Sequence, residues 1–384
     1  MQRQAPVYLD CNATTRCAPQ VVEAMLPFLT TEFGNAGSPH VMGRAAATAV
    51  AAAREAVAAL AGCSPGQIIF TSGATESNNL ALLGLARSNP GRRKIIVSAV
   101  EHKSILGPCD YLAEQGFQVV LLPVDRNASV DLEAAASLID EKTLLVSVQG
   151  GNNEVGTVQP VAEIGELARR CGAFMHTDGA QVLGKVPLDL HALPVHLASF
   201  SAHKLYGPKG VGALYVRDGE MRSLLTPLQF GGGQEDGLRP GTLNVPGIVG
   251  FGRACRLCSA DLASEPNRTA ALRDRFEAEL AGRLDCMAVN GTGAPRLPGT
   301  SSITIHGSAS DLVISRASGI CISQGSACGT GTLAPSHVLL AMGLPRAQAE
   351  QTIRLSFGRY NTAEDVSVAV GELATAVALT STRP

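Results

Sequence analysis

The sequence has no marked excess of charge of either sign. Its 31 lysine and arginine side chains nearly balance 33 acidic ones, which leaves a formal net charge of -2 over 384 residues. A domain dedicated to binding nucleic acid carries a clear basic excess. We therefore expect no direct nucleic-acid partner, although a transient charged partner stays open. The length is ample for a large core and indicates two lobes rather than one.

Long hydrophobic runs are also missing. The first ten residues, MQRQAPVYLD, turn polar at once and hold no apolar segment of signal-peptide length. No run reaches the roughly 18 apolar residues that a membrane span requires. We expect a soluble protein that has no membrane partner and is located in the cytoplasm.

Cysteine is too dilute for a disulfide scaffold, because the chain has ten cysteines at irregular spacing. Cys255 and Cys258 form the single CxxC pair, and no second pair accompanies it. We interpret this pair as incidental and expect no metal or redox role for it. The cysteines are expected to be reduced, which also favours the cytoplasm.

Short apolar segments alternate with helical patterns from about residue 44 onward. Apolar runs typical of buried strands lie at 67–70, 94–98, 118–122, 144–148 and 173–177. Helical patterns cover 44–60, 76–87, 104–115 and 160–171. This alternation predicts an α/β fold with a mainly parallel sheet covered by helices on both faces.

The alternation of short strands and helices ends at about residue 250. A long helical pattern covers roughly 248–282, a strand-like run follows at 301–305, and a final helix is expected after Glu364. This predicts a large domain at 13–255 and a smaller α+β domain made of 1–12 with 256–384. No repeat or obvious linker separates the two, so we expect them to pack closely. In such folds ligands bind beyond the carboxyl ends of the strands.

Polar residues lie at three places where a predicted strand ends and the next segment begins. FTSGATESNN (70–79) places small residues and hydroxyls at a helix start, where free backbone N–H groups can bind phosphate. An ordinary capped helix would show the same pattern, and no Walker-type motif occurs. VSAVEHKSI (97–105) places His102 just past a strand, and FMHTDGAQ (174–181) places Asp178 and Gln181 at a strand end.

The fourth junction, SFSAHKLYGPKG (199–210), contains Ser201, His203 and Lys204 after a short apolar strand. An isolated lysine is usually a solvated charge, but a lysine desolvated in a pocket becomes a nucleophile for carbonyl compounds. Together the four junctions match pyridoxal 5'-phosphate, which needs a lysine, a carboxylate at its ring nitrogen, a phosphate cup and a flat group over the ring. The corresponding residues are Lys204, Asp178, Gly73-Ala74-Thr75 with Ser201 and His203, and His102.

Further motifs extend this match over nearly the whole chain. From VYLDCNATT (7–15) to IRLSFGRY (353–360), the chain contains, in order, FTSGATES, EHK, NNEVG, HTDGAQ, SAHKLYGPKG, GGGQEDGLRPGT and GSAC followed by PSH. With these motifs the sequence resembles the cysteine desulfurases of the NifS/IscS type, in the class V branch of fold-type I pyridoxal-phosphate enzymes. The resemblance implies that fold, with a smaller α+β domain, and the conversion of L-cysteine to L-alanine and an enzyme persulfide.

The resemblance also implies the roles of individual residues. Lys204 would carry the cofactor, Asp178 would meet the ring nitrogen, Gln181 the phenolic oxygen, and His102 would stack on the ring. Asn153 would lie at the cofactor and the substrate. The implied phosphate contacts are Ala74, Thr75, Ser201 and His203, with Thr242 reaching across from the second subunit of a homodimer. The implied holder of the substrate carboxylate is Arg354, whose planar guanidinium suits that task.

Cys328 lies in the stretch GSACGTGT (325–332), whose small residues can neither bury a thiol nor fix it. The resemblance implies that its thiolate attacks the substrate sulfur after Lys204 has removed the α-proton, with His102 as a proton shuttle. The persulfide would pass to a sulfur-acceptor protein, either an iron–sulfur scaffold or another acceptor. The sequence leaves iron–sulfur assembly, tRNA thiolation, cofactor synthesis and sulfur modification of DNA open.

Some positions depart from the family pattern. Cys11 replaces a frequent aromatic residue, Gln324 replaces a small residue, and Gly329 replaces a common threonine. The chain ends about 25 residues after Tyr360, shorter than many relatives whose tail docks an iron–sulfur scaffold. Two other enzymes of similar cofactor site, a class V aminotransferase and a selenocysteine lyase, are alternatives. A non-enzymatic protein would lack the equivalents of Lys204 or Arg354.

Overall fold

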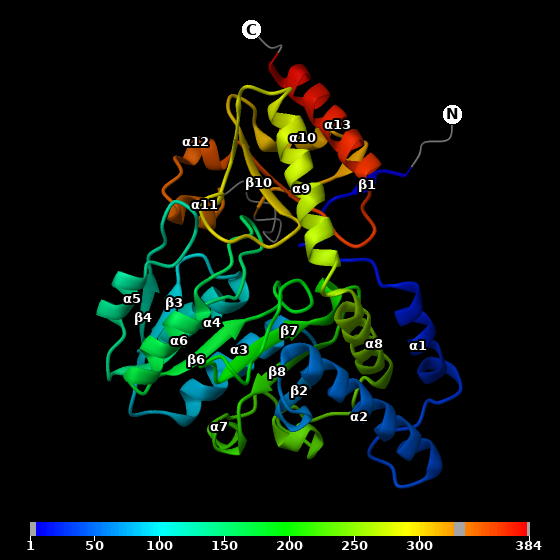
Figure 1. Ribbon diagram of the computed structural model, residues 1–384. Helices are drawn as coiled ribbons and strands as arrows, with labels where there is room; N and C mark the ends of the chain where they lie inside the picture. The colour runs from blue at the N-terminus through cyan, green and yellow to red at the C-terminus, as the bar shows by residue number, and fades with distance from the viewer. Residues whose placement is uncertain (1–4, 326–334, 382–384) are drawn as a thin grey trace.

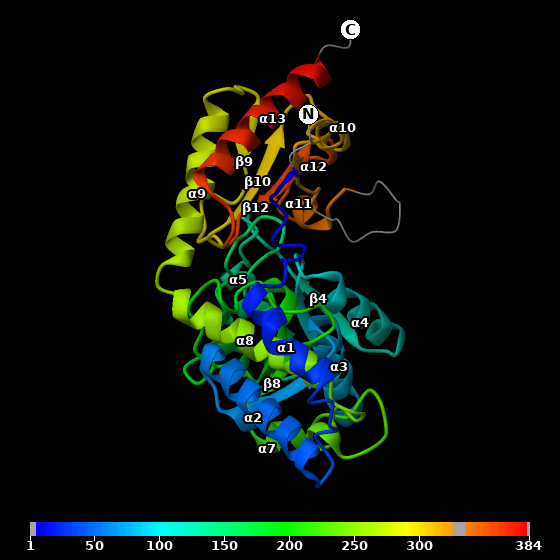
Figure 2. The same cartoon turned by 90° about the vertical axis from the view of Figure 1, so that its right-hand side faces the viewer.

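The computed structural model describes residues 5–325 and 335–381. Figure 1 shows two lobes, one above the other, and each has its own hydrophobic core. The sheet lobe consists of a seven-stranded sheet with helices α1 to α8. The second lobe consists of α9 to α13 with the small sheets formed by β1, β11, β9, β10 and β12. Figure 2, turned by 90°, shows the same division.

The large sheet has the strand order β2-β8-β7-β6-β5-β3-β4. Its strands are Ile68–Thr71 (β2), Lys94–Ser98 (β3), Gln118–Leu122 (β4), Thr143–Ser147 (β5), Phe174–Asp178 (β6), Leu197–Ser201 (β7) and Gly212–Val216 (β8). Pairs from β4 to β7 are parallel, whereas β8 runs antiparallel to both of its neighbours. The mainly parallel sheet predicted from the sequence is therefore confirmed.

Helices cover both faces of this sheet. They are Pro19–Thr30 (α1), Val41–Ala61 (α2), Ala74–Ser88 (α3), Lys103–Glu114 (α4), Leu132–Leu138 (α5), Val161–Arg170 (α6), Gly219–Ser223 (α7) and Val245–Asp261 (α8). Successive strand residues point to opposite faces. Ile68 and Phe70 accordingly pack in the core under α2 and α8, while Ile69 between them packs in the core under α3 and α4.

The second lobe is built on an antiparallel sheet of order β12-β10-β9. Its strands are Val7–Tyr8 (β1), Met287–Val289 (β9), Thr300–Ile305 (β10), Ile320–Cys321 (β11) and Thr352–Ser356 (β12), and its helices are Glu265–Ala281 (α9), Ser310–Arg316 (α10), His337–Ala341 (α11), Arg346–Ala349 (α12) and Ala363–Ser381 (α13). The amino-terminal strand β1 pairs with β11. Strand β1 therefore belongs to the second lobe, and the chain crosses from it to the sheet lobe.

The sequence pattern was wrong in one respect. The single long helix expected at 248–282 consists of two helices, α8 and α9, separated by residues 262–264. Pro266 at the start of α9 explains the break, because proline has no N–H to donate to the preceding turn and restricts the residue before it. The short helix α5 and the antiparallel strand β8 were not foreseen. The domain boundaries at residues 13 and 255 stay a prediction.

None of the helices within the described ranges combines the length and the apolar composition that crossing a bilayer requires. Cys255 and Cys258 are both buried in the core between α8 and the sheet. Cys11 is also buried, and this burial raises the pKa of its thiol to about 11. These three thiols therefore fill space in the interior of the protein.

The close approach of α2 and α8 gives a prediction about stability. A Cβ atom on Gly252 would lie 2.5 Å from Cα of Ala53 on α2, whereas a Cβ atom on Gly371 of α13 would meet open space. We expect Gly252→Ala to lower the free energy of unfolding by about 1–3 kcal/mol through overpacking. Gly371→Ala, the matched control, should raise it by about 0.5–1 kcal/mol. Denaturant unfolding measures both, and equal effects of the two substitutions would contradict this packing.

Candidate active site

A cavity of about 570 Å³ opens at the carboxyl ends of the sheet strands, facing the second lobe. Eleven of the residues singled out from the sequence line it: Gly73, Ala74, Thr75, His102, Asn153, Asp178, Gln181, Ser201, His203, Lys204 and Arg354. Thr242 is exposed and lies outside this lining. Cys328 and Gly329 lie outside the described residues. The structure thus brings the four strand junctions together, and Arg354 joins them from β12 of the second lobe.

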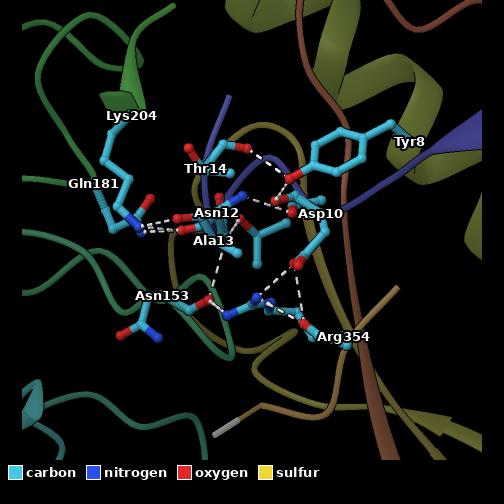
Figure 3. Close-up of polar contacts among 12 residues, drawn as sticks. Tyr8, Asp10, Asn12, Ala13, Thr14, Asn153, Gln181, Lys204 and Arg354 are labelled. Carbon is cyan, nitrogen blue, oxygen red and sulfur yellow. Dashed lines mark hydrogen bonds and ion pairs between the residues drawn. The ribbon is translucent and has the colours of Figure 1, made fainter. Parts of the chain in front are cut away.

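Lys204 reaches the cavity from the short turn that follows β7. Its Nζ donates hydrogen bonds to the main-chain oxygens of Asn12, at 2.6 Å, and Ala13, at 2.8 Å. Figure 3 shows this side chain meeting the Asn12–Thr14 segment together with Gln181. Because carbonyl dipoles hold the amine at the cavity wall, its position is fixed by the segment that follows β1.

Asp178 ends β6 and is buried. One carboxylate oxygen, Oδ1, accepts the N–H of Ala180 at 3.0 Å, and the other, Oδ2, accepts Nδ2 of Asn78 at 2.8 Å. Nδ2 of Asn78 also donates to Oγ of Ser104 at 2.8 Å. These hydrogen bonds fix the side-chain carboxyl group of Asp178 at one wall of the cavity.

His102 caps the amino terminus of α4 and lines the cavity. Its Nδ1 accepts the N–H of Ser104 at 3.1 Å, so the neutral ring carries its proton on Nε2. Burial lowers the pKa of His102, and the positive charge of Lys204 acts in the same direction, while Asp178 opposes both. A neutral imidazole at neutral pH follows from this balance.

The start of α3 also lines the cavity. Ala74 and Thr75 are its first residues, so their backbone N–H groups lack partners within the helix and can bind an anion. The acidic residue in this first turn, Glu76, is occupied elsewhere, because it accepts the N–H of Ser72 at 2.7 Å and Nε of Arg239 at 3.0 Å. A phosphate group is the kind of ligand that this end of the cavity suits.

Arg354 lies in β12 and is 3% exposed. Its Nη1 donates to the main-chain oxygen of Asn153 at 3.0 Å, and its Nη2 donates to Oδ1 of Asp10 at 2.6 Å and Oγ of Ser323 at 2.7 Å. Figure 3 shows these contacts below the Asn12 segment. Among the described residues Nε has no hydrogen-bond acceptor although it is buried. One donor of the guanidinium is therefore left for a ligand.

Asn12 connects both sides of the cavity. Its main-chain oxygen accepts both Nζ of Lys204 and, at 3.0 Å, Nε2 of Gln181. Its side-chain Nδ2 donates to the main-chain oxygen of Asn153 at 3.2 Å and to Oγ1 of Thr300 at 2.8 Å. Asn12 is thus bonded to the sheet lobe and to the second lobe at once.

Comparison with known proteins agrees with this geometry. A family model described as Aminotransferase class-V matches residues 7–368. The chain belongs to this family. It is similar to the cysteine desulfurase IscS of Anaeromyxobacter dehalogenans (strain 2CP-C), with 45% identity over 95% of this chain and 91% of that protein. The resemblance to the NifS/IscS type that the motifs indicated is therefore confirmed.

Solved structures extend the likeness to the fold. A NifS-like protein superposes with a TM-score of 0.90 at 38% identity, covering 97% of this chain and all of the other. A structure described as SspA in complex with cysteine gives a TM-score of 0.83 at 37% identity, covering 93% of this chain and 100% of that one. The predicted fold class, an α/β fold of the fold-type I pyridoxal-phosphate enzymes, is confirmed.

Sequence reasoning missed several residues that hold the cavity's side chains in place. Asn12, Asn78, Asp10 and Ser104 make the hydrogen bonds that hold the singled-out residues, yet none was proposed as a site residue. Asn12 lies within CNATT and Asn78 within FTSGATESNN, so both motifs carried a signal. Gln324, noted as a departure, donates through Nε2 to Oγ of Ser310 at 3.0 Å.

His203 gives a prediction about pH. Burial lowers its pKa from 6.5 to about 4, and Lys204, Lys209 and Lys185 act in the same direction. Between these two values the unfolded chain binds more protons than the folded one, so stability falls as the pH drops from about 6.5 to about 4. We expect His203→Gln to make this loss smaller in cofactor-free protein. The measurement is the free energy of unfolding against pH, and parallel curves for both proteins would contradict the assignment.

Proposed function

We propose that this chain binds pyridoxal 5'-phosphate and acts as a cysteine desulfurase, converting L-cysteine to L-alanine and leaving the sulfur as a persulfide on Cys328. The observation that carries the proposal is that Lys204, Asp178 and Arg354 line one cavity. Similarity to a protein named cysteine desulfurase supports the choice of cysteine as the substrate. The role given to Cys328 depends on the sequence resemblance alone.

The residues of the cavity fit the cofactor. Lys204 offers a primary amine for the aldehyde, and the carboxylate of Asp178 suits a protonated ring nitrogen. Gln181 would face the phenolic oxygen, and His102 would lie against the ring. The phosphate would meet the amino terminus of α3 at Ala74 and Thr75, with Ser201 and His203 beside it. Nε of Arg354, buried without an acceptor among the described residues, supports an anionic ligand on the other side.

When bound, pyridoxal phosphate withdraws electrons from the carbon that bears the substrate's amino group. Nζ of Lys204, in its neutral form, would accept the proton from that carbon. The guanidinium of Arg354 would hold the substrate carboxylate, with Asn153 beside it, and fix which bond faces Lys204. Nε2 of His102 would donate or receive a proton at the cavity wall.

The proposed sulfur transfer forms one bond and breaks another. The thiolate of Cys328 attacks the substrate sulfur, an S–S bond forms, and the C–S bond of the substrate breaks. The electron pair of that bond stays with the carbon, which takes up a proton and becomes the methyl group of alanine. The enzyme keeps the sulfur as a persulfide. The protons of alanine and of the persulfide come from the Cys328 thiol and from the substrate.

Cys328→Ser gives the direct test of this function. We expect alanine formation from L-cysteine to fall at least about 100-fold, because a hydroxyl is a far weaker nucleophile than a thiolate. Cofactor content and thermal stability should stay unchanged. Alanine release and persulfide labelling measure the effect, in the absence of any keto acid.

Cys286→Ser is the matched control, because this thiol is only partly buried and lies in the second lobe away from the cavity lining. It should keep full activity. Undiminished alanine formation by Cys328→Ser would contradict the proposal. Dependence on a keto acid would indicate an aminotransferase instead, and release of alanine from selenocysteine but not from cysteine would indicate a selenocysteine lyase.

The active protein is proposed to be a homodimer in which Thr242 contacts the phosphate of the partner's cofactor. Exposed apolar side chains on α1 and just after it form a surface that supports contact with a second copy of this chain. They recur at three- or four-residue spacing, as on one helix face, and are 43–74% exposed: Val22, Leu26, Leu29 and Phe33. An apolar stripe of this kind marks an interaction site.

The apolar stripe on α1 gives the test of the dimer. Light scattering should give twice the chain mass of 39.7 kDa for the wild type. Leu29→Glu places a charge in the stripe and should shift the protein toward monomer, with about a tenfold or greater loss of activity at equal concentration. The control Leu379→Glu, exposed on α13, should remain dimeric. A fully active monomer would contradict the proposed contact of Thr242.

The same proposal includes a sulfur-acceptor protein, either an iron–sulfur scaffold or another acceptor that removes the persulfide. The described cysteines are all free thiols. Free thiols support a reducing compartment, and we propose the cytoplasm.

A further inference from the structure

Two adjacent residues have a backbone conformation that side chains seldom adopt. Glu235 and Asp236 lie in the left-handed region, with φ angles of 48° and 55°. Residues other than glycine are uncommon there, because Cβ comes too close to the following carbonyl oxygen. Such residues persist only where the surrounding structure holds them, and they gather at functional sites. The turn that contains them, 234–237, belongs to the segment that leads to Thr242.

An ion pair holds the first of these two residues. The side chain of Glu235 is 2% exposed, and it accepts both terminal nitrogens of Arg54 on α2, Nη1 at 2.9 Å and Nη2 at 2.5 Å. Two parallel hydrogen bonds between a guanidinium and a carboxylate make a contact that is strong and directional. Oε2 of Glu235 also accepts the main-chain N–H of Phe70 at 2.8 Å. Both oxygens of this carboxylate are therefore occupied by donors.

The same pair covers the edge of the large sheet. Among the described strands β2 lies at one end of the order and pairs with β8. The outer side of such a strand presents N–H and C=O groups that need partners. Glu235 accepts the N–H of Phe70 in β2, and Arg54 donates to the main-chain oxygen of Ile68 in the same strand. The turn at 234–237 is therefore fixed to β2 and α2 of its own chain.

A further hydrogen bond connects this fixed turn to Thr242. Oε1 of Gln234 accepts the N–H of Gly241 at 2.9 Å. Gln234 directly precedes Glu235, and Gly241, whose φ is 106°, directly precedes Thr242. Thr242 is exposed and lies outside the lining of its own chain's cavity. An anchored loop thus ends in a hydroxyl that points to no site in the cavity of its own chain.

We propose that Glu235 is a positioning residue that acts on the neighbouring subunit, because it fixes the loop that presents Thr242 to the phosphate of the partner's cofactor. The inference deepens the proposed function and rests on it. A loop that is already rigid loses less conformational entropy when its hydroxyl binds the phosphate. Weakening the pair of Glu235 and Arg54 therefore loosens cofactor binding in the other subunit.

An effect within one subunit is the competing outcome. Nε of Arg239, three residues before Thr242, donates to Oε1 of Glu76 at 3.0 Å, in the first turn of α3. The loop is thus also connected to the part of its own chain that would hold a phosphate. The test must therefore show in which subunit a change at Glu235 is felt.

Mixed dimers separate the two subunits. In each of them one subunit carries Lys204→Ala, so that a single live site remains in its partner, and two different affinity tags isolate the mixed species. In the first dimer the Lys204→Ala subunit also carries Glu235→Gln, so the live site is wild type and faces the altered loop. In the second dimer Glu235→Gln lies in the subunit with the live site, which faces an unaltered loop. A mixed dimer without a change at Glu235 is the reference.

Glutamine keeps the shape of glutamate, but either orientation of its amide places the NH₂ group against a donor of Arg54. We expect pyridoxal phosphate to bind the live site of the first dimer about tenfold more weakly than that of the reference, as for the loss of one hydrogen bond to a charged group. The second dimer should bind it as tightly as the reference. Half-saturation of the visible absorption band of the lysine-bound cofactor measures both. Equal weakening in the two dimers, weakening in the second alone, or none in either would overturn the inference.

Two further variants keep the test valid if Glu235→Gln does not fold. Arg54→Lys keeps the positive charge and loses the two-pronged contact, and Gln234→Leu removes the hydrogen bond to Gly241 without touching the ion pair. Each, placed in the Lys204→Ala subunit, should weaken binding in its partner. The matched control Glu279→Gln breaks an exposed ion pair with Arg275 on α9 and should leave binding unchanged. Equal weakening by this control, or none by the two variants, would overturn the inference.

Thr242→Val, placed in the Lys204→Ala subunit, tests the proposed contact itself. It should weaken the live site of its partner as much as Glu235→Gln does. Weakening by Thr242→Val but not by Glu235→Gln would overturn the inference and leave the proposed function intact. No weakening by Thr242→Val would contradict the proposed contact with the partner's phosphate, and the inference would fail with it.

Discussion

The main-chain oxygen of Asn12 receives two donors, Nζ of Lys204 and Nε2 of Gln181, and the cavity is organised around this contact. The oxygen can act in this way because the segment that carries it follows β1, which pairs with β11 in the second lobe. The segment that contains Asn12 then crosses to the sheet lobe and lines the cavity on its way.

The same segment links Arg354 of the second lobe to Lys204 of the sheet lobe. Asp10, two residues before Asn12, pairs with Nη2 of Arg354, while the side chain of Asn12 donates to the main-chain oxygen of Asn153, which also accepts Nη1 of Arg354. A displacement of this segment would move Lys204 and Arg354 together. The geometry therefore ties the amine that would receive a proton to the guanidinium that would hold the substrate, although 150 residues separate them in the sequence.

Local patterns predicted the parts of the site that local physics determines. Apolar runs followed by Gly, His, Asp or Lys placed His102, Asp178 and Lys204 at strand ends, and parallel pairing brings such ends to one edge of a sheet. The partners of these residues depend on how distant segments pack, so Asn12 and Asn78 were missed. The break between α8 and α9 was missed because the apolar spacing continues across it and only Pro266 interrupts the backbone. The predicted contact of Thr242 lies in a second subunit and depends on how two chains pack.

The proposed function requires that Lys204, and not Lys185, carries the cofactor. Borohydride reduction of the purified protein, followed by proteolysis and mass spectrometry, tests this requirement directly, because it would make a lysine–cofactor bond permanent. The account predicts a single modified lysine, at position 204. Modification at Lys185 or Lys209, or none at any of the six lysines, would contradict it.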